Sequence, residues 1–161
     1  MTIGAIIKQK TSDLFTADEH EPFLTMAERL TRHDIGVLVV LDHAGALLGI
    51  ISERDLVHAI AVHKANALAH TARDVMTSKV IVCTPQQTEA QVMATMVEQH
   101  IRHMPVVEHG RVVGLVSLAD AVKQRLRKLG HAASPSSAAS SGTDRTIGNF
   151  SRHLGPKSGA H

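Results

Sequence analysis

The chain contains an internal repeat, and this repeat restricts its fold more than any other feature of the sequence. With a shift of 65 positions, residues 48–52 (LGIIS) fall on residues 113–117 (VGLVS), and Asp55 falls on Asp120. Before the turn at residues 42–45 the shift is 66 positions, and apolar residues again fall on apolar residues. A repeat through residues 1–130 predicts two copies of one supersecondary unit that bury a shared core.

Each copy has the same expected order of elements, β-α-β-β-α. Apolar residues at helical spacing predict the helices, and β-rich runs joined by short glycine-containing turns predict hairpins. In the first copy we expect strands at 13–16, 36–41 and 46–51 and helices at 22–33 and 53–65. In the second copy we expect strands at 80–83, 104–107 and 111–116, a helix that begins near Thr88, and a helix at 118–128.

The chain is expected to divide into five segments. These are a lead-in with a helix near 3–8 (1–12), the first repeat (13–65), a linker (66–77), the second repeat (78–130) and a tail (131–161). The tail is rich in Ser, Ala and Gly and lacks apolar periodicity, so we predict that it is disordered. It also carries the whole net charge of +2, which leaves the repeats neutral.

The composition argues against several classes of protein. The chain has no Trp, no Tyr and only three Phe, so it offers few platforms on which nucleic-acid bases could stack. Its single cysteine, Cys83, excludes an intrachain disulfide and fits a reducing compartment. We see no signal peptide and no apolar run long enough to span a membrane, and we expect a cytoplasmic protein.

The motif Gly-apolar-x-Ser-x-x-Asp occurs once in each copy, at the end of a strand and the start of a helix. It places Ser52 near Asp55, and Ser117 near Asp120. Free backbone N–H groups at a helix N-terminus attract anions, and a carboxylate accepts hydrogen bonds from a vicinal diol. The motif therefore suits a nucleotide. Ser-x-x-Asp also has the pattern of a capping box, and residues 71–74 fit that pattern as well.

The duplicated motif and the order of elements resemble a tandem pair of CBS domains (cystathionine β-synthase domains, together a Bateman module), over about residues 1–130. The resemblance implies an α/β (α+β) fold of two CBS repeats packed around a pseudo-two-fold axis, with two clefts between them. It implies an adenine-containing ligand such as AMP, ATP or NAD, held by Ser52 and Asp55 and by Ser117 and Asp120. Arg54 occupies a position that is often basic in stand-alone bacterial members of the family, so the resemblance places it with the nucleotide-binding residues. The resemblance also implies assembly into a homodimer.

The second copy differs from the first where its central strand begins. It has Arg102 and His103 there, whereas the first copy has Gly36 and Val37. In the family, basic residues at this position reach the phosphate of a nucleotide whose ribose lies on the other repeat. We therefore expect Arg102 and His103 to favour a phosphate in the cleft that holds Asp55. Lys10 is a weaker candidate for a phosphate contact.

The resulting expectation is a regulatory module that binds an adenine nucleotide, requires no cofactor and is not an enzyme. The chain lacks the standard catalytic fingerprints, and its twelve histidines do not fall into metal-ligand spacings. Two alternatives stay open. One is a nucleic-acid-binding or transcription-linked module that uses the basic residues at 123–128 and the tail. The other is a structural dimerisation module with degenerate clefts.

Overall fold

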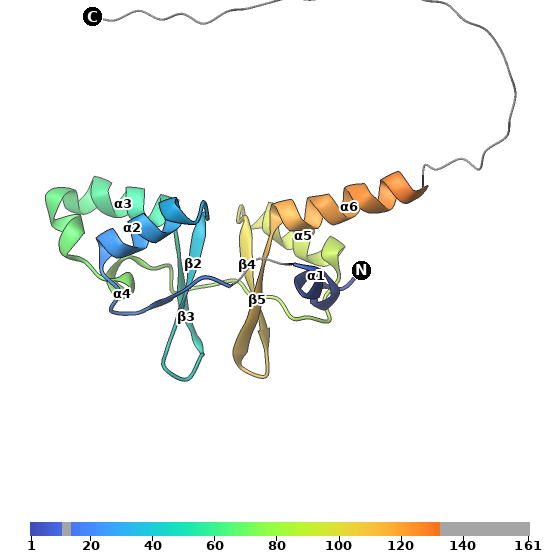
Figure 1. The fold of residues 1–161 in the computed structure, drawn as a ribbon, viewed down its shortest axis with the longest axis horizontal. Coiled ribbons are helices and arrows are strands. Elements are labelled where there is room, and N and C mark those ends of the chain that lie inside the picture. The colour runs from blue at the N-terminus through green and yellow to red at the C-terminus, as the bar shows by residue number, and fades with distance from the viewer. Residues whose placement is uncertain (11–13, 133–161) are drawn as a thin grey trace, which may run out of the picture.

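Two β-hairpins stand side by side at the centre of the molecule, and each is flanked by its own helices (Figure 1). The structure is a computed structural model that describes residues 1–10 and 14–132. The first repeat contains β1 (Thr16–Asp18), α2 (Phe23–Arg32), β2 (Val37–Leu41), β3 (Leu47–Ser52) and α3 (Glu53–His63). The second contains α5 (Glu89–Glu98), β4 (His103–Glu108), β5 (Arg111–Ser117) and α6 (Leu118–Ala132). The predicted α+β fold of two similar repeats is confirmed.

The sheet of the first repeat has the order β1-β2-β3. β2 lies in the middle, parallel to β1 and antiparallel to β3. Four of its five residues are buried, which agrees with their continuous apolar sequence VLVVL. The first strand was expected at 13–16 but spans Thr16–Asp18. Position 13 of that prediction lies outside the described residues.

The second repeat has only the two-stranded sheet β4-β5. The strand predicted at 80–83 is wrong, because that segment makes only an isolated bridge between Cys83 and Val106. Pro105 explains the difference. In the first repeat the Val39 N–H donates to the Phe15 carbonyl oxygen (3.0 Å) and extends the parallel ladder. Pro105 occupies the position of Val39 in the second repeat and has no N–H to donate.

The helices begin where their local sequence signals predict. α5 follows the N-cap Thr88, whose hydroxyl oxygen accepts a hydrogen bond from the Gln91 N–H. α2 follows Pro22 and α3 follows Ser52. α6 continues to Ala132, past the expected end at 128. The predicted disorder of the tail concerns residues beyond 132, which lie outside the described part of the chain.

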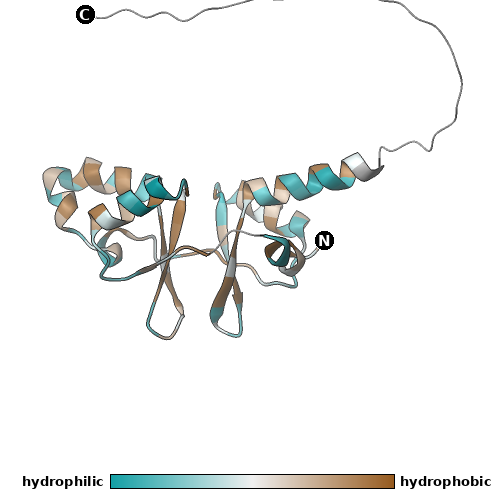
Figure 2. Ribbon diagram, in the orientation of Figure 1, coloured by the Kyte–Doolittle hydropathy of each residue, from teal (hydrophilic) through white to brown (hydrophobic). Residues whose placement is uncertain are grey.

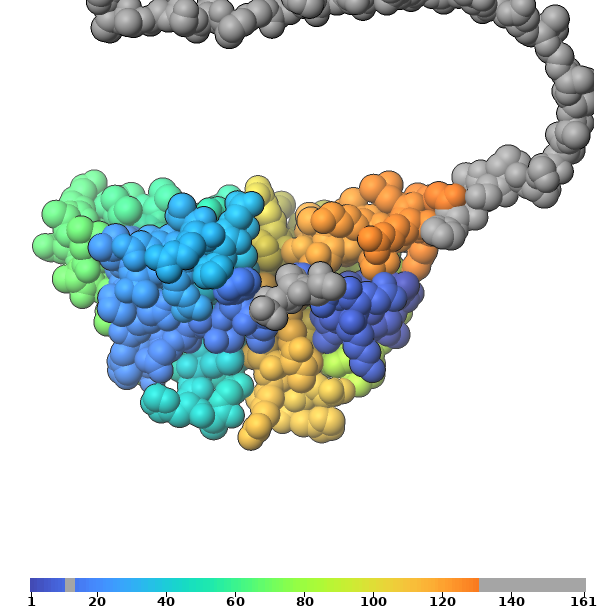
Figure 3. Space-filling view, in the orientation of Figure 1, coloured from blue at the N-terminus to red at the C-terminus, as the bar shows by residue number. Residues whose placement is uncertain are grey.

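The short helices that precede each repeat pack on the opposite repeat. α1 (Ile3–Gln9) contributes Ile3 and Ile6 to the core of the second repeat, and it lies beside α6 and the β4-β5 hairpin (Figures 1 and 3). α3 ends two residues before its expected end at 65, and a 3₁₀ helix, η1 (Lys64–Ala69), leads into the expected linker, which also contains α4 (Ala72–Val75). These contribute Ala67 and Ala72 to the core of the first repeat. The two repeats therefore exchange their lead segments.

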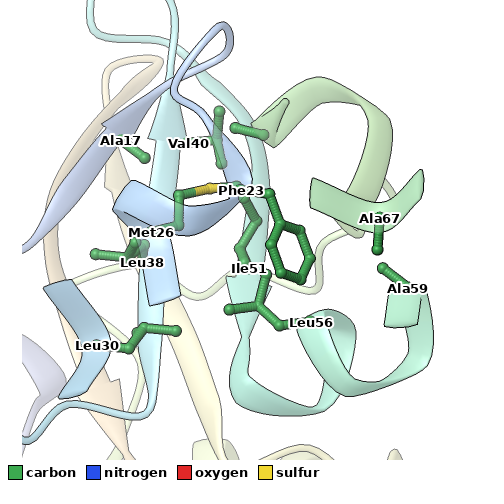
Figure 4. Packing of buried hydrophobic residues seen from close by; sticks show 11 residues of the cluster. Ala17, Phe23, Met26, Leu30, Leu38, Val40, Ile51, Leu56, Ala59 and Ala67 are labelled. Atoms are coloured by element: carbon green, nitrogen blue, oxygen red, sulfur yellow. The ribbon is translucent and has the colours of Figure 1, made fainter. Parts of the chain in front are cut away.

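Each repeat has its own apolar core, and the strands are the most hydrophobic elements (Figure 2). In the first repeat Met26 and Leu30 of α2 point towards the sheet (Figure 4). These side chains and Met96 of α5 are buried within their own repeats. Cys83 belongs to the second core, and burial raises the pKa of its thiol to about 11.

Among the described helices, none has both the length and the apolar character needed to cross a membrane.

Candidate functional site

A cleft of about 370 Å³ opens between the two repeats at the N-terminus of α3. We call it the Asp55 cleft. The first repeat contributes the end of β3 and the start of α3, and the second contributes the chain that leads into β4. Five of the eight site residues predicted from the sequence line this cleft together: Ser52, Arg54, Asp55, Arg102 and His103.

The Ser-x-x-Asp motif at the start of α3 forms a complete capping box, as the simpler interpretation predicted. The Ser52 N–H and hydroxyl both donate to Asp55 Oδ2, at 2.7 and 2.6 Å. In return the Asp55 N–H donates to Ser52 Oγ at 3.3 Å. The cap orients the carboxylate and leaves Oδ1 on its other side with a single partner among residues 1–10 and 14–132, the Thr77 hydroxyl, which donates to it at 3.0 Å.

Thr77 lines the Asp55 cleft but was missed by the sequence analysis. It follows α4 and lies 22 positions from Asp55, so no local pattern connects the two residues. No sequence signal could have found it, because the contact arises from the exchange of lead segments in the folded chain. Thr77 and Ile50 form an isolated antiparallel bridge, which holds the threonine against β3 beside the motif.

The cations of the Asp55 cleft come from both repeats. Arg54 is the second residue of α3, and Arg102 immediately precedes β4. Both side chains are exposed, and neither has an ion pair among the described residues. The Arg102 carbonyl oxygen accepts a hydrogen bond from the Leu118 N–H at 2.8 Å, which fixes the backbone at this point. Arg54 and Arg102 therefore line one cleft together with the acidic residues Glu53 and Asp55.

His103 lies between the clefts rather than in one alone, since it lines both. It lies close to Gly36, where a Cβ atom would be 3.5 Å from His103 Cε1, an ordinary van der Waals contact. Burial lowers the pKa of His103 below 6.5, and the nearby charges of Lys10 and Arg102 add to this against the opposing effect of Asp120. Protonation of His103 therefore requires a pH below its ordinary pKa of 6.5.

The second cleft, of about 310 Å³, is lined by Ser117, Lys10, His103 and residues 34–37. We call it the Ser117 cleft. Asp120 does not line it, but lines a separate cavity of about 270 Å³ together with Lys10. Lys10 Nζ donates to Asp120 Oδ2 at 2.8 Å and to the Leu115 carbonyl oxygen at 3.3 Å. Lys10 thus binds the motif carboxylate in this structure. The Ser117 N–H also donates to Asp120 Oδ2, and the Asp120 N–H donates to Ser117 Oγ.

The ionisation of Asp120 reflects these contacts. Partial burial by itself would raise the pKa of Asp120, but the hydrogen bonds from Lys10 and Ser117 outweigh it and hold the pKa below the ordinary value of 3.8. Asp120 is therefore a carboxylate at neutral pH with a cation beside it. Among residues 1–10 and 14–132, no group of three or more His, Cys, Asp or Glu side chains could hold a metal ion.

The two clefts, the duplicated motif and the repeated fold agree with the comparison to known protein families. The family model described as "CBS domain" matches the chain twice, over residues 4–62 and 72–127. The chain belongs to the CBS domain family. Each match contains one copy of the Gly-apolar-x-Ser-x-x-Asp motif, with Ser52 and Asp55 in the first and Ser117 and Asp120 in the second.

Solved structures show that this CBS pair is similar to other tandem CBS pairs. The CBS-domain containing protein ATU1752 from Agrobacterium tumefaciens is 36% identical, with a TM-score of 0.73, over 78% of this chain and 99% of that one. The CBS domain pair of protein MJ0100, solved with 5′-methylthioadenosine and S-adenosyl-L-methionine, is 28% identical. Its TM-score is 0.70, over 80% of this chain and 98% of that one.

Among curated proteins, the mitochondrial CBS domain-containing protein CBSX3 of Arabidopsis thaliana is 36% identical over 98 residues. The aligned stretch makes up 58% of this chain and 48% of CBSX3. The CBS pair thus spans about half the length of that relative.

Proposed function

We propose that this CBS pair is a regulatory module that binds an adenine nucleotide in the Asp55 cleft. The observation that carries the proposal is the arrangement of that cleft, where the motif residue Asp55 and two arginines from different repeats line the same space of about 370 Å³, together with Glu53. The solved CBS pair of MJ0100 holds two adenosine-containing ligands, which supports the ligand class. AMP, ATP and NAD all carry an adenine, a ribose and at least one phosphate, which are the groups that this cleft would bind.

The ribose is the part of the ligand that the Asp55 carboxylate would bind. Oδ2 is occupied by the capping hydrogen bonds, whereas Oδ1 accepts only from Thr77 within the described part of the chain. Oδ1 therefore has capacity for a ribose hydroxyl. Val37, Ile50 and Ile101 line the same cleft and would pack against the faces of an adenine ring, in place of the aromatic side chains that the chain lacks.

The phosphate would lie on the second repeat. Arg102 presents a planar guanidinium group that matches a phosphate in a bidentate manner, and Arg54 adds a second positive charge from α3. A nucleotide bound in this way contacts Asp55 of the first repeat and Arg102 of the second. It would favour the relative packing of the repeats that fits it, and a partner protein would sense that change. The proposed role requires no catalysis and no cofactor, and we expect the module to act as a homodimer.

The basic cluster on α6 gives less support to a nucleic-acid-binding function. Lys128 Nζ donates to Glu89 Oε2 at 2.8 Å, and the Glu89 side chain is only 3% exposed. This lysine therefore serves the packing of α6 on α5 and is less available for a phosphate backbone.

AMP binding to the Arg102→Ala variant tests the proposal. We expect the variant to bind AMP about ten- to a hundredfold more weakly than wild type in isothermal titration calorimetry, because it loses a charge-assisted hydrogen bond to the phosphate. Asp55→Ala is expected to weaken AMP and adenosine alike, since it removes the ribose acceptor.

Arg111→Ala is the matched control, because Arg111 is an exposed arginine at the start of β5 outside both clefts. It should bind AMP like wild type. Equal AMP affinities for wild type, Arg102→Ala and Asp55→Ala would contradict the proposal.

A further inference from the structure

We infer that Asp34 makes the Ser117 cleft selective for adenosine without a phosphate group, so that one chain can hold AMP in the Asp55 cleft and adenosine in the Ser117 cleft. The inference rests on the proposed function, because it assigns a different ligand to the second cleft of the same module. It gives Asp34 the role of a specificity-determining residue.

The turns that lead into the two central strands have the same backbone but different side chains. Asp34 and His100 are equivalent in the repeat, and both have a left-handed backbone, with φ of 50° and 53°. The next residue in each repeat donates its N–H to a carbonyl oxygen of the preceding helix, at 3.0 Å in the first repeat and 2.9 Å in the second. Asp34 lines the Ser117 cleft and His100 lines the Asp55 cleft. An acidic side chain therefore stands at one cleft where an imidazole stands at the other.

Within the described part of the chain, no arginine lines the Ser117 cleft. The two arginines that we propose to hold a phosphate both line the Asp55 cleft. At the position of Arg102 the first repeat has Gly36, which has no side chain to offer. The exposed carboxylate of Asp34 would in addition repel the negative charge of a phosphate group.

The basic side chains that do line the Ser117 cleft offset Asp34 only weakly. Lys10 Nζ donates to Asp120 Oδ2 at 2.8 Å, so a carboxylate outside the cleft balances its charge. Burial lowers the pKa of His103 below 6.5, so this side chain is mostly uncharged at neutral pH. Asp34 itself has no ion pair among residues 1–10 and 14–132. Its negative charge therefore decides which ligand charge this cleft accepts.

The walls of the Ser117 cleft suit the uncharged part of an adenosine. Apolar side chains from both repeats make up more than half of its lining, among them Leu14, Phe15 and Val113. The Phe15 ring lies against the His33 ring, with the ring centroids 4.7 Å apart, and offers an aromatic surface on which a base can stack. A volume of about 310 Å³ falls within the range of small-molecule sites.

Adenosine binding to protein saturated with AMP tests the inference, measured by native mass spectrometry and isothermal titration calorimetry. We expect wild type to hold one AMP and one adenosine per chain. Asp34→Asn removes the charge and keeps a residue that tolerates the left-handed backbone. AMP should then bind in the Ser117 cleft about three- to tenfold more tightly than in wild type and compete with adenosine there. Glu28→Gln removes the same charge from an exposed position of α2 outside both clefts, and it should behave like wild type.

A second variant tests where the adenosine binds. Phe15→Leu keeps an apolar side chain against the core of the first repeat but removes the ring. Adenosine should bind to this AMP-saturated variant about three- to tenfold more weakly than to wild type. Equal adenosine affinities would place the adenosine elsewhere and overturn the inference. Asp34→Gly replaces Asp34→Asn if the latter does not fold, because glycine adopts the same backbone conformation.

The outcomes separate this inference from the proposed function. Two AMP molecules on wild type, or one AMP and no adenosine, overturns the inference and leaves nucleotide binding intact. Equal AMP binding by wild type and Asp34→Asn overturns the role of Asp34. No AMP on wild type and one AMP on Asp34→Asn overturns the proposed Asp55 site and supports the role of Asp34. No AMP and no adenosine on either protein overturns both.

Discussion

At the scale of single residues, His103 shows how the packing of two repeats changes the chemistry of one side chain. It lies against Gly36 of the first repeat and lines both clefts. Burial is the main reason that the pKa of His103 is lowered from 6.5, and the charges of Lys10 and Arg102 act in the same direction. The folded protein therefore binds fewer protons at this position than the unfolded chain does.

The lowered pKa of His103 predicts a contribution to the pH dependence of stability. The unfolded histidine takes up a proton as the pH falls below 6.5, whereas the folded one does so only at its lower pKa. Stability is thus lost as the pH falls through this interval. Between about pH 7 and 5, we expect the free energy of unfolding to fall more steeply for wild type than for His103→Gln in urea titrations. Equal slopes would contradict the assigned burial of His103.

At the scale of elements, the glycine of each motif allows a lead segment to approach a strand closely. A Cβ atom at Gly49 of β3 would lie 2.7 Å from Met76 Sδ and 2.8 Å from the Thr77 carbonyl oxygen. At Gly114 of β5 it would lie 3.2 Å from Ile7 Cγ2, which is a side-chain atom. The glycines recognised as part of a binding motif are therefore also required for packing.

We expect Gly49→Ala to lower the free energy of unfolding by about 1–3 kcal/mol, because the backbone oxygen of Thr77 cannot move without breaking its bridge to Ile50. Gly114→Ala should cost less, since the Ile7 side chain can adjust. Urea denaturation measures both changes. Gly130→Ala is the control: no atom lies within 4 Å of its Cβ position in α6, and helix propensity predicts a gain of roughly 0.5–1 kcal/mol. Equal costs at Gly49 and Gly130 would contradict the close approach.

At the scale of the whole molecule, the exchanged lead segments make each repeat depend on a part of the chain that precedes the other. Ile3 of α1 is completely buried in the core of the second repeat. The Ile3 N–H donates to the Gln87 carbonyl oxygen at 2.9 Å, and the Gly4 N–H donates to that of Pro85 at the same distance. A destabilising substitution in α1 should therefore weaken the packing of the second repeat more than that of the first.

Ile3→Ala is expected to cost about 2–5 kcal/mol, because it removes a fully buried side chain and leaves a cavity. Hydrogen exchange should show the largest loss of protection in β4, β5 and α5, although the substitution lies before the first repeat. Met26→Ala, at a fully buried position of the first core, should show the reverse pattern with the largest loss in β2 and β3. Loss of protection in the first repeat for Ile3→Ala would contradict the exchanged packing.

Much of the secondary structure and part of the candidate site follow from the sequence alone, because their signals are local. Helix starts at Thr88 and Ser52, and the two hairpins, depend on side chains within a few positions of one another. The duplicated motif likewise identified Ser52, Asp55 and their counterparts without any knowledge of contacts. The missing strand at 80–83 was also foreseeable, since Pro105 stands where an N–H is needed.

Only the tertiary structure decided how the two motif carboxylates differ. Lys10 bonds to Asp120 across 110 positions of sequence, and Thr77 bonds to Asp55 across 22. Neither pairing leaves a periodic pattern, because each arises when a lead segment packs on the opposite repeat. The sequence by itself determined two similar repeats with similar motifs. The exchange of segments gave Asp120 an ammonium group and Asp55 a hydroxyl group as neighbours, because the packing of a folded chain brings distant side chains together.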